Sequence, residues 1–286
     1  MNDKSKMDIK LNQQYIKYNV FLIGAMKCGT STIFKYLQQN PQICMPIIKE
    51  PEYFSKTLGH SKYKDGAYLD LFTIQPQHKY TFDGSTGYSK FPLEKGVPKR
   101  IFEANLNPKF IYIVRNPFDR IESHYNYMQK DLGWKNTMTS DHLINISNYQ
   151  LQLKEYLKFF KKADILVLDF DELRSDPEKT ITKIHTFLES DHRFELTEKI
   201  QNNKTKLVNK NEIRLKKQLN GKLKWIPKPI KDFFRNRLFL KRKKTLTSKQ
   251  KLKIKNALQE DLLKFGAEFN INVEKWGFSL NNHSKT

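Results

Sequence analysis

Residues 21–32, FLIGAMKCGTST, join an apolar run to a turn that could bind an anion. Gly24 and Gly29 would allow a tight backbone path, and Lys27 adds a positive charge between them. Three consecutive hydroxyl side chains follow the turn: Thr30, Ser31 and Thr32. If the turn opens a helix, the backbone N–H groups of residues 27–31 would point into it, and the helix N-terminus adds positive potential. The stretch therefore predicts a site for a phosphate-like group, and an ordinary turn capped by a threonine is the less favoured interpretation.

The lysine of this turn stands in a different place from the lysine of an ATP-binding loop. A Walker A loop has its lysine directly after the second glycine, where this chain has Thr30. Lys27 comes two residues before Gly29, and no acidic partner for a magnesium ion is evident. The seven histidines show no metal-ligand spacing, so we expect no metal. An ATP–magnesium site is disfavoured, and the anion that the turn holds is left open.

A second motif, FIYIVRNPFDRIESHY at 110–125, could hold another anion. Arg115 leaves the end of an apolar run, and Ser123 lies nearly two turns into the helix that should follow. A guanidinium fork together with a hydroxyl suits a second phosphate. The alternative is that Arg115 pairs with Asp119 and tethers the helix. The motif indicates a second anion site more strongly in combination with the first turn than alone.

The elements that must position these residues follow from the apolar runs. Four runs predict buried strands, at 19–24, 79–84, 109–115 and 163–170. All but the second are followed closely by a helix-start signal; two of these signals are Asn116-Pro117 and Asp176-Pro177. The helix after Gly29 should end at Asn40-Pro41. Repeated strand–turn–helix order predicts a mainly parallel sheet flanked by helices. Binding sites in such sheets lie beyond the carboxyl ends of the strands.

Length and composition are those of a folded α/β protein. The chain has 286 residues and is 38% hydrophobic. We expect a polar tail over 1–18 and a single domain over 19–280 with a helical, basic C-terminal part. The tail lacks the apolar core of a signal peptide, and no apolar run is long enough to span a bilayer. Two cysteines, Cys28 and Cys44, give no disulfide framework. We therefore expect a cytoplasmic protein.

The charge is concentrated in one segment. The net charge is +22, and residues 204–256 carry 20 Lys and Arg against only Glu212 and Asp232. Such a field attracts polyanions, whether nucleic acid, anionic lipid or acidic polysaccharide, although a solvated helical face would look the same. Within it, residues 225–244 interleave aromatic with basic side chains. They could lie on an anionic membrane surface as a peripheral helix, or bury the aromatic residues on the domain, which we favour.

The two motifs resemble those of one enzyme family. Residues 27–31 resemble the 5′-phosphosulfate loop of sulfotransferases that use 3′-phosphoadenosine 5′-phosphosulfate (PAPS), and residues 115–125 resemble their 3′-phosphate motif. Residues 170–188 also look like this family, and the likeness covers roughly 20–280. It leans toward the heparan-sulfate-type and bacterial carbohydrate branch. The resemblance implies a P-loop-kinase-like fold and sulfuryl transfer to a hydroxyl or amine, from a donor that has no γ-phosphate and needs no metal.

The resemblance also implies roles for particular residues. Glu50, in the stretch IKEPEYFS at 48–55, matches the general base of the carbohydrate branch, and Lys27 would neutralise charge on the leaving phosphate. The alternative is that Glu50 or Glu52 only pairs with Lys49 or another surface base. The implied donor contacts are Lys27, Cys28, Gly29, Thr30, Ser31, Thr32, Arg115 and Ser123, with Lys204 and Arg214 in the stretch 202–214.

Some features depart from the family. Residues 83–88, after the predicted second strand, contain no lysine, although some eukaryotic heparan sulfotransferases carry one in the corresponding loop. The chain also lacks the cysteines for their late disulfide loop. We therefore expect different acceptor contacts and argue against heparan sulfate itself. Cys28 lies inside the anion loop, where positive potential should lower its thiol pKa, but we do not favour a nucleophilic role because no histidine partner is evident.

The leading hypothesis is a sulfotransferase acting on a carbohydrate that is acidic or lipid-linked. One rival is a P-loop phosphotransferase or kinase, against which the position of Lys27 argues. The other is a basic module that binds nucleic acid or a membrane surface through residues 204–256, which would need neither Arg115 nor Glu50. Nucleic acid is the least favoured partner.

Overall fold

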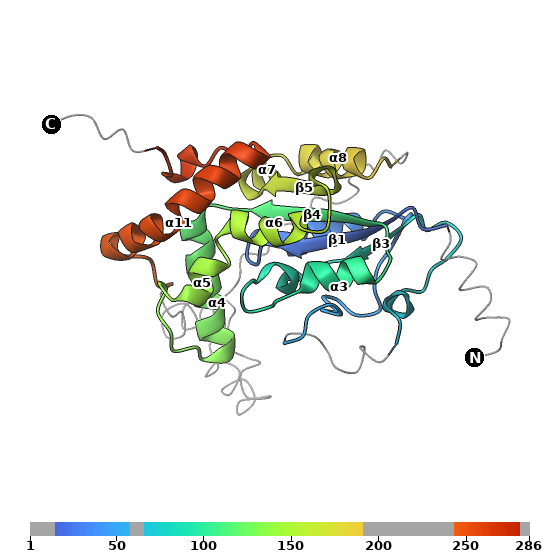
Figure 1. Ribbon diagram of the computed structural model, residues 1–286, viewed down its shortest axis with the longest axis horizontal. Coiled ribbons are helices and arrows are strands. Elements are labelled where there is room, and N and C mark those ends of the chain that lie inside the picture. Colours follow the sequence, from blue (N-terminus) through green and yellow to red (C-terminus); the bar gives the residue numbers. More distant parts are fainter. Residues whose placement is uncertain (1–14, 58–65, 191–242, 281–286) are drawn as a thin grey trace, which may run out of the picture.

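A five-stranded parallel sheet forms the centre of the protein (Figure 1). The computed structural model describes residues 15–57, 66–190 and 243–280, apart from the side chains of residues 130–132. The strands are β1 (Tyr18–Gly24), β2 (Ile43–Cys44), β3 (Tyr80–Asp83), β4 (Pro108–Val114) and β5 (Ile165–Asp169). Their order is β2-β3-β1-β4-β5, with every neighbouring pair parallel. The predicted fold class is confirmed, and only the short β2 was not anticipated.

The two central strands, β1 and β4, are apolar and buried on both faces, as is typical of a parallel sheet covered by helices. Residues 20–24 of β1 and 110–114 of β4 are all buried. A strand buried on both faces must be covered by helices, and connections that place helices there run parallel strands side by side. In the observed strand order β1 is the middle strand, and its carboxyl end lies between β3 and β4.

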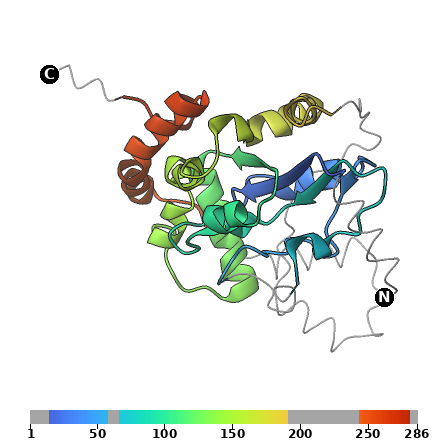
Figure 2. The same ribbon diagram turned by 45° about the vertical axis from the view of Figure 1, so that its right-hand side comes forward.

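Helices flank the sheet and extend it at one end. They are α2 (Thr30–Leu37), α3 (Val97–Glu103), α4 (Pro117–Leu132), α5 (Asp141–Asn145), α6 (Tyr149–Leu157), α7 (Phe170–Ser175), α8 (Pro177–Phe187) and α11 (Ser248–Phe269). Short 3₁₀ helices are η2 (Tyr68–Leu71), η3 (Thr86–Ser89), η4 (Lys162–Asp164) and η5 (Glu274–Trp276). Figure 2 shows α4, α5 and α11 together on one side of the sheet.

The helix starts agree with the sequence signals. Asn116 caps α4 by accepting a hydrogen bond from the Phe118 N–H at 3.0 Å, with proline at the first helical position. Asp176 caps α8 in the same way through the Lys179 N–H at 3.0 Å. The end of α2 was predicted less well, because the helix stops at Leu37 rather than at Asn40-Pro41.

The basic C-terminal part is described from residue 243 onward. Within α11, a stripe of buried side chains faces the protein: Ile254, Leu258, Leu262 and Phe265. Asp261 accepts hydrogen bonds from the N–H groups of Gln150 (3.0 Å) and Leu151 (2.8 Å), so α11 caps the first turn of α6. Lys204, Arg214 and the segment 225–242 lie outside the described residues.

Candidate functional site

The predicted anion loop joins β1 to α2. Gly29 is the N-cap of α2 in the left-handed conformation (φ 93°), and it provides no side-chain cap. The first N–H groups of a helix have no acceptor within the helix, and the first turn of α2 carries no acidic side chain. The uncapped start of α2 therefore offers N–H donors and positive potential at the carboxyl end of the central strand.

Cys28 differs from two expectations. Its N–H donates to the Ala25 carbonyl at 3.2 Å, so this amide is used inside the loop and does not point to a ligand. Its side chain is fully buried, and burial raises the pKa of the thiol to about 12, whereas we had expected the loop to lower it. The sequence argument considered the charge of the loop and missed desolvation, which is larger for a thiol that points into the core. The finding argues further against a nucleophilic role.

Lys27 connects the loop to α4. Its backbone has a positive φ of 72°, and its ammonium lies 4.4 Å from the centre of the Tyr127 ring. Tyr127 is one helical turn beyond Ser123 on α4, and Ser123 is half-buried. The structure thus brings the lysine of the first motif onto the helix that carries the hydroxyl of the second.

A buried arginine holds α4 in place. The Arg120 side chain is fully buried and donates to the Ser147 hydroxyl at 2.7 Å and to the Leu143 carbonyl at 2.5 Å. Its Nη1 is 3.1 Å from Nδ1 of His124. Burial lowers the pKa of Arg120 and that of His124. The His124 ring therefore stays neutral. Sequence reasoning passed over Arg120, although an arginine within an amphipathic helix was the available signal.

Arg115 follows β4, and its Nε group has no hydrogen-bond partner among the described residues. Its Nη2 is 3.2 Å from Oδ2 of Asp119, which is the helix tether that the sequence left open as an alternative. The guanidinium carbon lies 4.8 Å from the centre of the Phe170 ring. Its Nε is buried and makes no hydrogen bond in the described part of the chain. The tether exists, and a buried donor still remains for a ligand.

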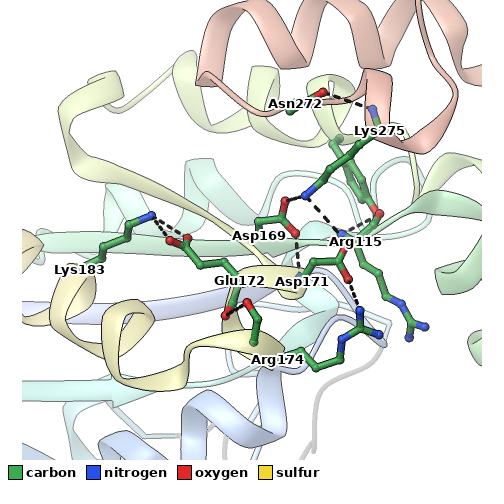
Figure 3. Close-up of polar contacts among 10 residues, drawn as sticks. Arg115, Asp169, Asp171, Glu172, Arg174, Lys183, Asn272 and Lys275 are labelled. Atoms are coloured by element: carbon green, nitrogen blue, oxygen red, sulfur yellow. Dashed lines mark hydrogen bonds and ion pairs between the residues drawn. The ribbon is translucent and has the colours of Figure 1, made fainter.

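Ionic contacts fix the segment beside Arg115 (Figure 3). Asp169 ends β5 and caps α7 through the Asp171 N–H at 2.8 Å, and it also accepts a hydrogen bond from Lys275 of η5. Glu172 of α7 pairs with Lys183 of α8 at 2.6 Å. These contacts tie β5 and α7 to α8 and to the C-terminal part of the described chain, so the start of α7 is held from several sides.

Glu50 lies next to the anion loop through Lys49. The Lys49 ammonium is 3.4 Å from the Ser31 hydroxyl and 3.8 Å from Oε1 of Glu50. The Thr86 hydroxyl donates to Oε2 of Glu50 at 3.3 Å. The Glu50 side chain is 37% exposed, so a substrate can reach it. The pairing with Lys49 is therefore present, and it also places the carboxylate beside the start of α2.

Glu52 has the opposite environment. It is buried, with Oε2 accepting from the Ser55 hydroxyl at 2.6 Å and Oε1 from the Gly87 N–H at 2.7 Å. Its own N–H donates to the Ser85 hydroxyl at 2.9 Å. Burial raises the pKa of this carboxyl, although its hydrogen bonds oppose the shift. Glu52 is therefore a structural anchor between the 49–55 loop and the residues after β3, and it cannot contact an acceptor.

Asp83 and Lys90 complete this buried network. Asp83 accepts from the Ser85 hydroxyl at 2.6 Å and the Tyr88 hydroxyl at 2.8 Å, and burial raises its pKa to about 7. Lys90 is half-buried just after η3, and burial lowers its pKa while the charges of Glu52 and Glu50 oppose that shift. Residues 83–88 contain no lysine, as noted from the sequence, yet a lysine two residues further on supplies positive charge near Glu50.

Metal-ligand clusters and membrane-spanning helices are both absent from the described residues. Within 15–57, 66–190 and 243–280, no group of three or more His, Cys, Asp or Glu side chains is arranged to hold a metal ion. In the same residues, no helix is long and apolar enough to cross a bilayer.

Known proteins resemble this chain in sequence and in fold. Heparan sulfate glucosamine 3-O-sulfotransferase 3B1 of Homo sapiens is 26% identical over 186 residues, covering 58% of this chain and 45% of that protein. Bifunctional heparan sulfate N-deacetylase/N-sulfotransferase 4 of Mus musculus is 23% identical over 214 residues, covering 65% and 24%. The chain thus spans less than half the length of these relatives.

The solved sulfotransferase of Alicyclobacillus acidocaldarius shares the fold. Its TM-score is 0.65 at 19% identity, and the match covers 91% of this chain and 98% of that one. Residues 17–266, which include the anion loop, Glu50 and Arg115, match the sulfotransferase domain family. The chain belongs to the sulfotransferase domain family.

Proposed function

We propose that this protein transfers a sulfuryl group from PAPS to a hydroxyl group of a carbohydrate, with an amine as the other acceptor of the same chemistry. One observation carries the proposal: the uncapped start of α2, the partly unpaired Arg115 and the exposed carboxylate of Glu50 meet at one edge of the sheet. The donor carries its transferable sulfuryl group at the end of the 5′-phosphosulfate and a separate phosphate at the 3′ position, so it calls for two cationic subsites.

The residues present fit such a donor. Lys27, the N–H groups at the start of α2 and the hydroxyls of Ser31 and Thr32 would hold the 5′-phosphosulfate. Arg115, through its buried unpaired Nε, and Ser123 on α4 would hold the 3′-phosphate. Thr30 is buried, so its hydroxyl contributes less than those of its neighbours, and Cys28 would contribute only its place in the loop.

Glu50 would accept the proton of the acceptor hydroxyl. A carboxylate is a competent general base when it lies within hydrogen-bond reach of that proton. Thr86 holds one of its oxygens, which leaves the other toward Lys49 and the start of α2. Lys49 and Lys27 would stabilise the negative charge that develops at the transferring group and at the leaving phosphate.

A carbohydrate acceptor is supported by the relatives named for heparan sulfate and by the charge of the surface. Lys249, Lys251 and Lys253 are exposed at the start of α11, and Lys243 is exposed just before it. Exposed cations of this density favour an acidic acceptor. The loop after β3 differs from the heparan-type pattern noted in the sequence, so we propose an acidic or lipid-linked glycan other than heparan sulfate.

A thermal-shift titration with adenosine 3′,5′-bisphosphate, the desulfonated donor product, tests the donor assignment. A ligand that binds only the folded state raises the melting temperature. We expect a rise for the wild type and none for Arg115→Ala at the same ligand concentration. Lys35→Ala is the matched control, because Lys35 is an exposed cation on the last turn of α2, away from the loop.

The same titration discriminates against the kinase alternative. ATP with magnesium should give a smaller shift than the bisphosphate, since the loop has no lysine after Gly29. A shift with ATP and magnesium but none with the bisphosphate would overturn the proposal. Incubation with PAPS and a panel of acidic oligosaccharides, followed by mass spectrometry, then identifies the acceptor by a gain of one sulfuryl group.

A further inference from the structure

One aromatic ring lies between the two predicted donor subsites. Phe170 is the first residue of α7, directly after β5. A Cβ atom added at Gly29 would lie 2.8 Å from Cδ2 of Phe170, so the ring packs against the backbone of the anion loop. The Arg115 guanidinium carbon lies 4.8 Å from the centre of the same ring. No other contact described for this site joins Gly29 and Arg115 through a single side chain.

Two contacts orient the Arg115 guanidinium: the Phe170 ring and the Asp119 carboxylate. The contact with the ring is the better shielded from water. The ion pair with Asp119 is exposed on the carboxylate side, where the side chain is 54% accessible, and exposed pairs contribute little. A cation over an aromatic face is stronger where it is shielded from water, and the Arg115 side chain is only 22% exposed. Because a guanidinium binds an oxyanion as a planar fork, its orientation decides which oxygens it can reach.

Phe170 itself is held firmly. The preceding Asp169 caps α7 through the Asp171 N–H and is bonded to Lys275 (Figure 3). Leu173, one turn further on, is buried and would also be contacted by a Cβ at Gly29, at 3.1 Å. The ring therefore cannot move without displacing either the start of α7 or the loop at Gly29.

We propose that Phe170 is a positioning residue that aligns Arg115 with the anion loop, and that it thereby sets the preference for a nucleotide carrying a 3′-phosphate in addition to its 5′ group. The inference rests on the proposed function and deepens it. The absence of a side chain at Gly29 has a specific meaning in this view: it lets the ring approach the loop so that both subsites share one support.

Binding constants for two nucleotides test the role. Adenosine 3′,5′-bisphosphate and adenosine 5′-monophosphate are titrated by calorimetry into wild type, Phe170→Leu and Phe170→Tyr. We expect Phe170→Leu to weaken binding of the bisphosphate about tenfold, as loss of a shielded cation–π contact implies. Binding of the monophosphate should change less than about twofold. Phe170→Tyr keeps the ring and should keep the preference. Phe187→Leu is the matched control. Its ring lies under a different cation, with the Lys109 ammonium 5.1 Å from the ring centre, and takes no part in the site.

The outcomes separate the inference from the proposed function. If the wild type binds both nucleotides equally, the proposed function and the inference fail together. If the wild type prefers the bisphosphate and Phe170→Leu keeps that preference in full, only the inference fails. An equal loss for both nucleotides shows a merely structural role and also overturns it. If Phe170→Leu does not fold, as judged by its melting curve, Phe170→Met takes its place in the same comparison.

Discussion

The donor side and the base side of the site are built in different ways. The donor side rests on one turn and one helix start: β1 ends, Gly29 takes a left-handed conformation, and α2 begins without a side-chain cap. The base side has no such local motif. Glu50 is held by Thr86, and its loop is anchored through Glu52 to Ser85 and Gly87, more than thirty residues away along the chain.

This difference has an energetic meaning. Backbone N–H groups at a helix start stay in place as long as the helix exists, so donor binding should tolerate changes in distant side chains. A buried carboxylate that accepts several hydrogen bonds is different, because removing one partner leaves a charge or a polar group unsatisfied. The base side should therefore lose its geometry more readily than the donor side.

The largest effect is expected for Lys27→Met. This change removes the charge placed for the leaving phosphate, and loss of one such stabilising group typically lowers turnover by about 10²–10³. Binding of adenosine 3′,5′-bisphosphate should fall as well, since the lysine belongs to the donor side. Radiolabelled sulfate transfer and calorimetry measure the two quantities. Bisphosphate binding equal to that of wild type would remove Lys27 from the donor side.

Glu50→Gln should separate the two sides most clearly. The amide keeps the shape of the carboxylate but cannot accept a proton, so turnover should fall by about 10²-fold. The bisphosphate should bind as it does to wild type, because no donor contact is lost. Glu52→Gln provides the comparison: its side chain is buried and should affect turnover only through loop position. Turnover near that of wild type in Glu50→Gln would contradict its role as the base.

Gly87→Ala should weaken the base side alone. The added Cβ would lie 2.2 Å from Oε2 of Glu52, so the carboxylate must move and take the 49–55 loop with it. We expect turnover to fall about tenfold, as for a small misplacement of a catalytic group, with unchanged bisphosphate binding. In the background Glu52→Ala the methyl group has no carboxylate to displace, and Gly87→Ala should then cost little more. If the losses of turnover add in the double variant, Gly87→Ala does not act by displacing the Glu52 carboxylate.

A smaller effect concerns stability against pH. Burial raises the pKa of Asp83 to about 7, above its unfolded value of about 3.9, so the folded state binds the proton more tightly. The resulting stability is fully present below pH about 4 and is lost as the pH rises to about 7. As the pH rises from about 4 to about 7, the melting temperature of Asp83→Asn should fall less than that of wild type.

Asp261→Asn is the control for that measurement. Burial raises the Asp261 pKa to about 6, so its contribution is lost between pH about 4 and about 6. Between pH 6 and 7 the two variants should therefore differ, with Asp261→Asn following wild type and Asp83→Asn showing the flatter curve. Identical curves for Asp83→Asn and wild type over pH 4–7 would contradict the assigned shift.

The smallest effect is expected outside both sides of the site. Replacing the exposed Lys249, Lys251 and Lys253 by glutamine should leave bisphosphate binding unchanged and weaken binding of an acidic oligosaccharide a few-fold. The loss should be larger at low salt, since exposed charges are screened over about 8–10 Å at physiological ionic strength. Equal binding by wild type and the triple variant at low salt would leave these lysines as a solvated surface.

The donor side could be predicted because its signals are local. A strand, a glycine turn and three hydroxyls lie within residues 21–32, and Asn116-Pro117 marks the helix start beside Arg115. The direction of the Cys28 pKa shift was predicted wrongly, because the side to which a loop residue points depends on the packing of distant elements. Four of the five strands could be predicted from their apolar runs, whereas β2 was too short to give a pattern.

The base side could be predicted only in part. Glu50 was named through the family resemblance, but nothing in IKEPEYFS distinguishes its exposed carboxylate from the buried one of Glu52, two residues later. That difference arises from Ser85 and Gly87, whose proximity depends on the pairing of β3 with β1. The place of Phe170 beside Gly29 depends in the same way on the position of α7. The roles of Lys27, Glu50, Arg115 and Ser123 remain predictions.

The bond between Asp169 and Lys275 has a consequence for the order in which the protein is made. The two residues are 106 positions apart, and Lys275 is among the last described residues to leave the ribosome. While the chain is being synthesised, β1, β4 and β5 can emerge and pair before η5 exists. The edge of the sheet that carries Arg115 and Phe170 is therefore completed late in synthesis. A nascent chain that stops before residue 275 contains both predicted donor motifs but lacks one of the contacts that hold the start of α7.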